Sequence, residues 1–259
     1  MKILSVIDTL ANVTPRPLSR RAAVRRMGGI GAGLALAALP AVLTTWGSRA
    51  QASTARSQST NDVLNFLLKL EWMKASFYGA GLETADLIPA EDRAVYQQIH
   101  KQELEHVQVW EEILAAAALP KPAWDYTAGG AYPDTLTNYA TFQAMSQSFE
   151  DLAVRAYQGQ MAALLSQSAV LTPALRILAV EGRHAAEARR VRGQKPWISF
   201  NNSDSASLSG VYAGEENHIQ AGVDVGGGGA ASQAFDEPLT MSQCLAITDQ
   251  FIAPPPVAA

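Results

Sequence analysis

The residues best suited to chemistry in this chain are glutamates and histidines that occur in two repeats. Each repeat has a single glutamate followed by a Glu-x-x-His motif, with separations of 32 and 31 residues between the two glutamates. The six residues are Glu71, Glu103, His106, Glu150, Glu181 and His184. Helix positions i and i+3 share a face, so each motif directs a carboxylate and an imidazole toward one point. On four helices, these residues form the ligand set of a two-metal carboxylate site.

Carboxylate oxygens with one imidazole per metal suit iron or manganese, so we predict two Fe ions, with two Mn ions as the alternative. Glu103 and Glu181 would bridge the metals, and the open positions would accept O2 or peroxide. Four buried carboxylates without a metal would each cost several kcal/mol. A structural zinc site would need thiolates, but Cys244 is the only cysteine.

Two tyrosines extend the repeat, because Tyr78 and Tyr157 each follow a single glutamate by seven residues. They could donate hydrogen bonds to the carboxylates or be ordinary core residues. The similar Glu215-Glu-Asn-His218 lies in a Gly-rich segment without an apolar stripe, so we attribute its spacing to chance.

The elements that position these residues are predicted from helical periodicity and from Pro and Gly. We expect four helices: one capped by Asn61 or Asp62, one from Pro89 to Pro120, one over 136–168 with a break near Gly159, and one from Thr172–Pro173 to Gly193. A long connection over 119–136 predicts an all-α four-helix bundle with one crossover, spanning residues 61–200. Residues 201–259 predict an irregular Gly/Ser/Asn-rich tail with a short docking helix over 240–249.

The N-terminus carries the pattern of an export signal. Paired arginines at 20 and 21 precede an apolar run from Gly28, and Ala50-Gln51-Ala52 is a cleavage site. We therefore predict a signal peptide over 1–52, exported by the twin-arginine route, and a flexible leader over 53–60. The protein would be periplasmic or in the cell envelope, without a stable membrane anchor after cleavage; the alternative is a retained anchor.

The charge of the exported chain excludes some partners. Residues 53–259 contain 13 basic and 23 acidic residues, a net charge of −10. This argues against nucleic acids and anionic membranes. A single cysteine allows no intrachain disulfide, and a homo-oligomer is compatible with the sequence.

The chain resembles the ferritin-like superfamily, and within it the exported branch that includes plant and bacterial desiccation-related proteins. The resemblance is carried by Asp62-Val-Leu-Asn-Phe-Leu-Leu-Lys-Leu-Glu71 with Phe77-Tyr78, by Val211-Tyr-Ala-Gly-Glu215, and by Ala234-Phe-Asp-Glu-Pro-Leu-Thr240. It implies a four-helix bundle with a di-iron or di-manganese centre, ligated by the six residues of the repeat. It does not fix a reaction, because such bundles include ferroxidases, peroxide reducers, manganese catalases, oxygenases and members without a shown activity.

Three functions follow as hypotheses. The first is an exported di-metal protein that reacts with O2 or peroxide, by Fe(II) oxidation or peroxide removal. The second is a non-catalytic desiccation or stress protein with a structural or empty metal site. The third is a cell-envelope interaction module that acts through the 201–259 tail.

Overall fold

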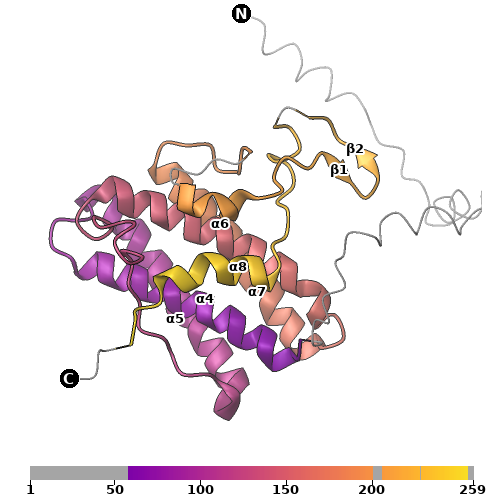
Figure 1. The fold of residues 1–259 in the computed structure, drawn as a ribbon, viewed down its shortest axis with the longest axis horizontal. Helices are drawn as coiled ribbons and strands as arrows, with labels where there is room; N and C mark the ends of the chain where they lie inside the picture. Colours follow the sequence, from indigo (N-terminus) through magenta and orange to yellow (C-terminus); the bar gives the residue numbers. More distant parts are fainter. Residues whose placement is uncertain (1–57, 201–205, 228, 256–259) are drawn as a thin grey trace, which may run out of the picture. The chain divides into compact units, whose positions relative to one another are not determined.

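Four long helices form the bulk of the computed structural model, which describes residues 58–200, 206–227 and 229–255. They are α4 (Thr60–Glu83), α5 (Ala90–Leu114), α6 (Tyr139–Leu164) and α7 (Ser168–Val191). Helix α4 packs along α5 and α6 along α7, and the two hairpins meet mainly through α4 and α6. Figure 1 shows these helices side by side. The expected all-α bundle with a long connection between its second and third helices is confirmed.

The boundaries of all four helices differ from expectation, and α5 ends at Leu114, six residues before the predicted end at Pro120. Helix α4 begins slightly earlier, because Ser59 forms a capping box with Asp62: the Ser59 hydroxyl accepts from the Asp62 N–H at 3.2 Å, and the Asp62 carboxylate accepts from the Ser59 N–H at 3.0 Å. Helix α7 begins at Ser168, so Pro173 lies inside it rather than at its start. Asn138 caps α6, which starts three residues after the predicted position.

The predicted break near Gly159 is wrong, because α6 continues through this residue. Gly159 has a packing role instead. A Cβ atom at this position would lie 1.9 Å from the backbone oxygen of Leu239. The missing side chain lets the segment at Leu239 approach α6, where the Leu239 N–H donates to the Arg155 carbonyl at 3.0 Å.

The connection between the hairpins is fixed to the bundle. It follows the short helix η1 (Ala115–Ala117) and leads to Asn138. The Tyr126 hydroxyl donates to the Met73 carbonyl of α4 at 2.8 Å. This contact holds the crossover against the first helix.

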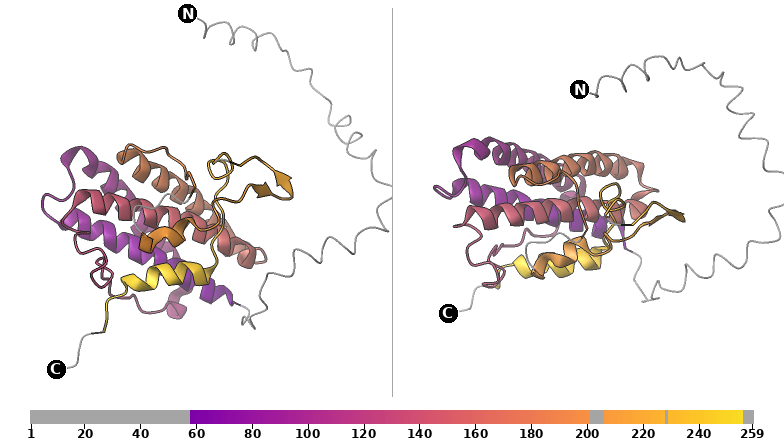
Figure 2. Two further views of the ribbon diagram at one scale, coloured as in Figure 1. Left: turned by 45° about the horizontal axis from the view of Figure 1, so that its top comes forward. Right: turned by 90° about the horizontal axis from the view of Figure 1, so that it is seen from above.

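Residues 206–255 add small elements: η2 (Ala206–Tyr212), strands β1 (Ile219–Gln220) and β2 (Val223–Asp224) in an antiparallel pair, α8 (Met241–Thr248) and η3 (Asp249–Phe251). Figure 2 shows α8 and η2 along one side of the bundle, where both contact α6. The predicted docking residues Ile247 and Phe251 are buried and Leu245 is partly buried.

The N-terminal predictions, a signal peptide over 1–52 and most of the leader over 53–60, lie outside the described residues. Within the described residues, none of the helices has the length and hydropathy needed to cross a bilayer.

Candidate metal centre

Six side chains predicted from the repeat converge in the middle of the bundle. Helix α4 supplies Glu71, α5 supplies Glu103 and His106, α6 supplies Glu150, and α7 supplies Glu181 and His184. The four glutamates are fully buried, and the histidines are 7% and 3% exposed. They meet because each lies on the inner face of its helix, at the spacing that the sequence predicts.

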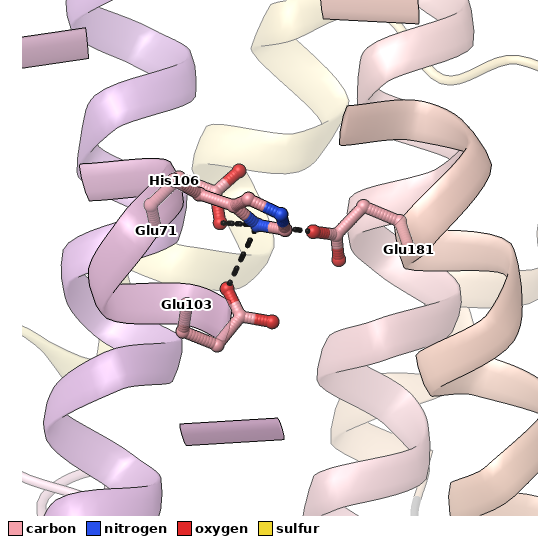
Figure 3. Close-up of side chains that lie close together, drawn as sticks. All are labelled: Glu71, Glu103, His106 and Glu181. Carbon is pink, nitrogen blue, oxygen red and sulfur yellow. Dashed lines mark ion pairs between the residues drawn. The ribbon is translucent and has the colours of Figure 1, made fainter. Parts of the chain in front are cut away.

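The convergent side chains form two groups that could each hold a metal ion. One group contains Glu71, Glu103, His106 and Glu181, and the other contains Glu103, Glu150, Glu181 and His184. In each group the ligand atoms lie within 4.8 Å of one another. Figure 3 shows the first group around the imidazole of His106. Glu103 and Glu181 belong to both groups, which is the position expected of bridging carboxylates.

The donor set fits a hard divalent metal. His106 Nδ1 lies 3.0 Å from a Glu181 oxygen and His184 Nδ1 lies 2.9 Å from a Glu103 oxygen, yet neither nitrogen has a partner in hydrogen-bond geometry. These contacts are short but misdirected, and a hydrogen bond depends on direction as well as on distance. Buried nitrogen and oxygen atoms that face one another without forming hydrogen bonds are expected where they serve as ligands of a common cation.

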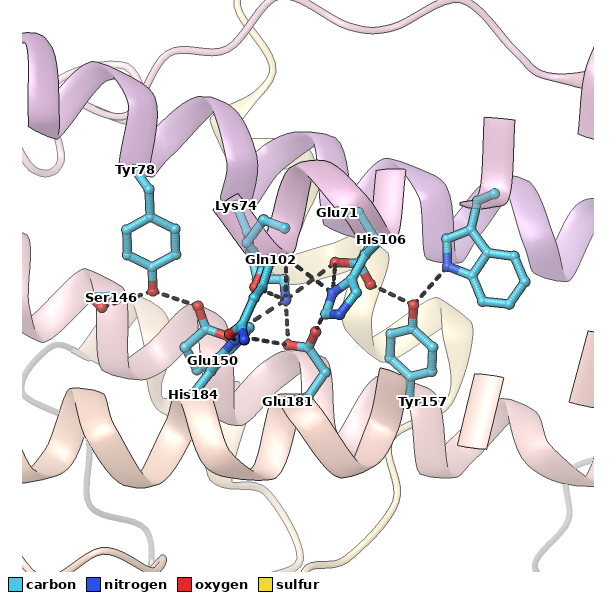
Figure 4. A network of polar contacts seen from close by, with 12 residues as sticks. Glu71, Lys74, Tyr78, Gln102, His106, Ser146, Glu150, Tyr157, Glu181 and His184 are labelled. Atoms are coloured by element: carbon cyan, nitrogen blue, oxygen red, sulfur yellow. Dashed lines mark hydrogen bonds and ion pairs between the residues drawn. The ribbon is translucent and has the colours of Figure 1, made fainter. Parts of the chain in front are cut away.

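Lys74, which does not belong to the repeat, lies inside the same cage. Its ammonium contacts Glu71 at 3.3 Å, Glu103 at 2.9 Å, Glu150 at 3.4 Å and also Glu181, and its side chain is fully buried. Figure 4 shows it between the two hairpins. The signal in the sequence that could have identified it is its position three residues after Glu71, which places it on the same face of α4.

The two tyrosines hold the glutamates of the opposite hairpin. The Tyr78 hydroxyl contacts Ser146 at 2.9 Å and donates to Glu150, while Tyr157 donates to Glu71. The indole N–H of Trp110 donates to Tyr157 at 2.8 Å. Burial raises the pKa of both tyrosines, so their hydroxyls stay protonated and can donate. Figure 4 shows the two tyrosines at opposite ends of the cage.

The charges of the side chains at the centre are nearly balanced. Burial opposes every charge, but the carboxylates raise the pKa of His106 to about 12 and that of His184 to about 10, and they raise the pKa of Lys74. Burial opposes the charge of Glu71 as well, but Lys74 and His106 hold the pKa of Glu71 below its usual value. Burial and the Glu103 carboxylate raise the pKa of Glu181 to about 7. Three cations therefore face four carboxylates, one of which is partly protonated near neutral pH.

A surface pocket leads toward one side of the centre. It has a volume of about 420 Å³ and lies between α5 and α7, where Gln102, Arg183 and His184 line it. His184 Nε2 lies 2.7 Å from the side-chain oxygen of Gln102. A small molecule in this pocket would therefore reach the imidazole of His184.

The Glu-x-x-His motif in the tail does not form a similar group. Glu215 is buried and pairs with Arg155 at 3.1 Å, whereas His218 is exposed and lies 3.1 Å from Asp224. Among the described residues, the two groups that could hold a metal both lie at the bundle centre.

Comparison with known proteins agrees with this architecture. The profile of a family described as a ferritin-like domain matches residues 59–194. A comparison with curated proteins found no match. The matched residues span all four long helices and all six of the convergent ligands.

Proposed function

Because the chain belongs to the family of ferritin-like domains, we propose that it is an exported metalloprotein of the desiccation-related branch. Its bundle centre binds Fe or Mn, and the metal reacts with O2 or peroxide. The outcome would be Fe(II) oxidation or peroxide removal. The observation that supports this function is the convergence of four fully buried glutamates and two histidines from four helices.

The residues around the ligands suit such a centre. Tyr78 and Tyr157 hold one oxygen of Glu150 and Glu71, which orients the other oxygen toward the cage. The side chain of Gln102 accepts the Nε2 proton of His184, so Nδ1 faces the carboxylates. A bound metal would supply the redox chemistry, and the apolar bundle would keep bulk water away from it. The pocket beside His184 would admit O2 or peroxide.

The test is the metal content of the purified protein, measured by elemental analysis without chelator in the preparation. We expect stoichiometric Fe or Mn in the wild type and its loss in a Glu103→Ala/Glu181→Ala double variant. Glu105→Ala is the matched control, because Glu105 is an exposed glutamate on α5. Loaded protein should then consume O2 or peroxide. Absence of metal after anaerobic loading with Fe(II) or Mn(II) would contradict the proposal.

One observation favours a second function, a non-catalytic stress protein. Lys74 and the protonated histidines balance the carboxylates, so the centre can persist as a buried polar network without metal. This function predicts a colourless protein whose thermal unfolding does not change with chelator or with added Mn(II). A shift in the unfolding temperature with added metal would favour the first function.

A further inference from the structure

The two halves of the repeat differ at a buried position inside the cage of carboxylates. Glu71 and Tyr78 in α4 correspond to Glu150 and Tyr157 in α6, with the same separation. Three residues after each glutamate, however, α4 has Lys74 and α6 has Ala153. Both side chains are buried. Among the described residues, Lys74 is the only lysine whose ammonium lies among these carboxylates. The second half of the repeat has no counterpart to it.

The ammonium of Lys74 uses the carboxylate oxygens that face His184. His184 Nδ1 lies 2.9 Å from Glu103 Oε1, 3.6 Å from Glu150 Oε2 and 3.9 Å from Glu181 Oε2. Lys74 donates a hydrogen bond to each of these three oxygens, at 2.9 Å to Glu103 Oε1 and 3.4 Å to Glu150 Oε2. The other oxygen of Glu150 is taken by Tyr78. We call the group of Glu103, Glu150, Glu181 and His184 the His184 position. A metal bound there would have to displace the ammonium of Lys74.

The other group, which we call the His106 position, is different. Each of its four residues has one potential metal-ligand atom that makes no hydrogen bond. These atoms are Glu71 Oε2, Glu103 Oε2, His106 Nδ1 and Glu181 Oε1. Lys74 lies near the first two at ion-pair distances of 3.3 and 2.9 Å, but not in hydrogen-bond geometry. At the His184 position, only His184 Nδ1 lacks such a partner. The unused ligand atoms therefore gather on one side of the cage.

We propose that Lys74 replaces one of the two metals, and that the centre holds a single divalent ion at the His106 position. The ligands of this ion are Glu71, Glu103, Glu181 and His106. The inference rests on the proposed metal function and changes the ion count that the ligand set alone predicts. One divalent ion and one ammonium supply three positive charges to offset the charges of the four carboxylates.

The experiment compares Mn(II) binding to the wild type and to Lys74→Ala, which gives the first half the residue that the second half has. The stoichiometry is measured by anaerobic titration calorimetry, and the spacing of the ions by electron paramagnetic resonance. We expect one isolated Mn(II) per chain in the wild type and an exchange-coupled pair in Lys74→Ala. Lys69→Ala is the matched control, because Lys69 lies on the same helix but pairs with Asp249 outside the cage. If Lys74→Ala does not fold by circular dichroism, Lys74→Gln serves in its place.

The outcomes separate this inference from the proposed function. Two ions in the wild type, or one ion in the folded Lys74 variant, would overturn the inference while metal binding stands. No ion in either protein would overturn both.

A second experiment tests where the single ion lies. Loss of an outer hydrogen bond to a metal ligand weakens binding by roughly 10–100-fold, and Glu71→Gln should weaken Mn(II) binding by more than this because it removes a ligand. A larger loss in Glu150→Gln than in Glu71→Gln would place the ion beside His184 and overturn the inference.

Discussion

At the scale of single residues, the centre depends on hydroxyl groups that cross between the hairpins. Tyr157 of α6 donates to Glu71 of α4, and Tyr78 of α4 donates to Glu150 of α6. Each bond fixes one carboxylate oxygen and leaves the other to face the cage. The tyrosines therefore link the orientation of the ligands to the packing of α4 against α6.

Tyr157→Phe should weaken metal binding by about 10–100-fold, because Glu71 loses the donor that orients it. It should also lower the free energy of unfolding by about 1–3 kcal/mol, because the Trp110 indole N–H loses its buried acceptor. Metal titration and urea unfolding measure the two effects. Tyr126→Phe is the control, because its buried hydroxyl bonds a backbone carbonyl. An equal loss of metal affinity in both variants would contradict the role of Tyr157.

At the scale of elements, glycine has opposite roles in two neighbouring helices. Gly159 of α6 makes room for the backbone of Leu239, whereas Gly182 of α7 is exposed, and a Cβ atom added there would have no neighbour within 4 Å. Helix continuity alone disfavours both glycines, since glycine costs about 0.5–1 kcal/mol relative to alanine in a helix. Only the contact with Leu239 explains why α6 tolerates this cost at Gly159.

Gly159→Ala should therefore destabilise the protein by about 1–3 kcal/mol, because the new methyl group would push the Leu239 backbone away from α6. Gly182→Ala should stabilise it by about 0.5–1 kcal/mol through helix propensity. Chemical unfolding of the two variants beside the wild type measures both changes. Equal effects of the two substitutions would show that the approach of Leu239 does not limit stability.

At the scale of the whole molecule, a buried guanidinium joins residues 206–239 to the bundle. Arg155 of α6 pairs with Glu215 at 3.1 Å and donates to the carbonyls of Val211, Ala213 and Glu237. The side chains of Arg155 and Glu215 are fully buried. This segment is held by charge as well as by the apolar residues of α8.

Arg155→Met should cost about 3–5 kcal/mol of unfolding free energy, because it leaves the Glu215 carboxylate buried without its cation. Arg190→Met is the matched control. Arg190 forms an exposed pair with Glu187, so its loss should cost less than about 1 kcal/mol. Thermal unfolding and limited proteolysis after residue 200 measure the difference. Equal unfolding temperatures for the two variants would contradict the role of Arg155.

The same contact predicts a dependence of stability on pH. Burial raises the pKa of Glu215 to about 7 despite the nearby Arg155, compared with 4.5 for an unperturbed glutamate. An acid whose folded pKa is raised binds its proton more tightly in the folded state, so its contribution to stability falls as pH rises from about 4.5 to about 7. We expect a decrease of about 1 kcal/mol after allowing for solvent screening. Urea unfolding across this range should show a smaller decrease in Glu215→Gln; an unchanged pH profile would refute the assignment.

The sequence by itself determined the bundle and the meeting of its glutamates and histidines. A Glu-x-x-His spacing must place both side chains on one helical face, and two equal repeats must bring four such faces around one core. The tyrosines belong to the same repeat, but their hydrogen bonds across the hairpins depend on the fit of α4 against α6.

Only the tertiary structure decided what surrounds these ligands. The spacing places Lys74 near Glu71, but a lysine side chain has four flexible carbons and can extend to solvent. Its burial follows from carboxylates that α5, α6 and α7 supply. Likewise, Gly159 and Arg155 are explained by partners about 60 to 80 residues away, which no local pattern specifies. Local spacing determines which face of a helix a residue occupies. The neighbours of that residue, and the charges that its side chain must balance, are set by packing between distant segments.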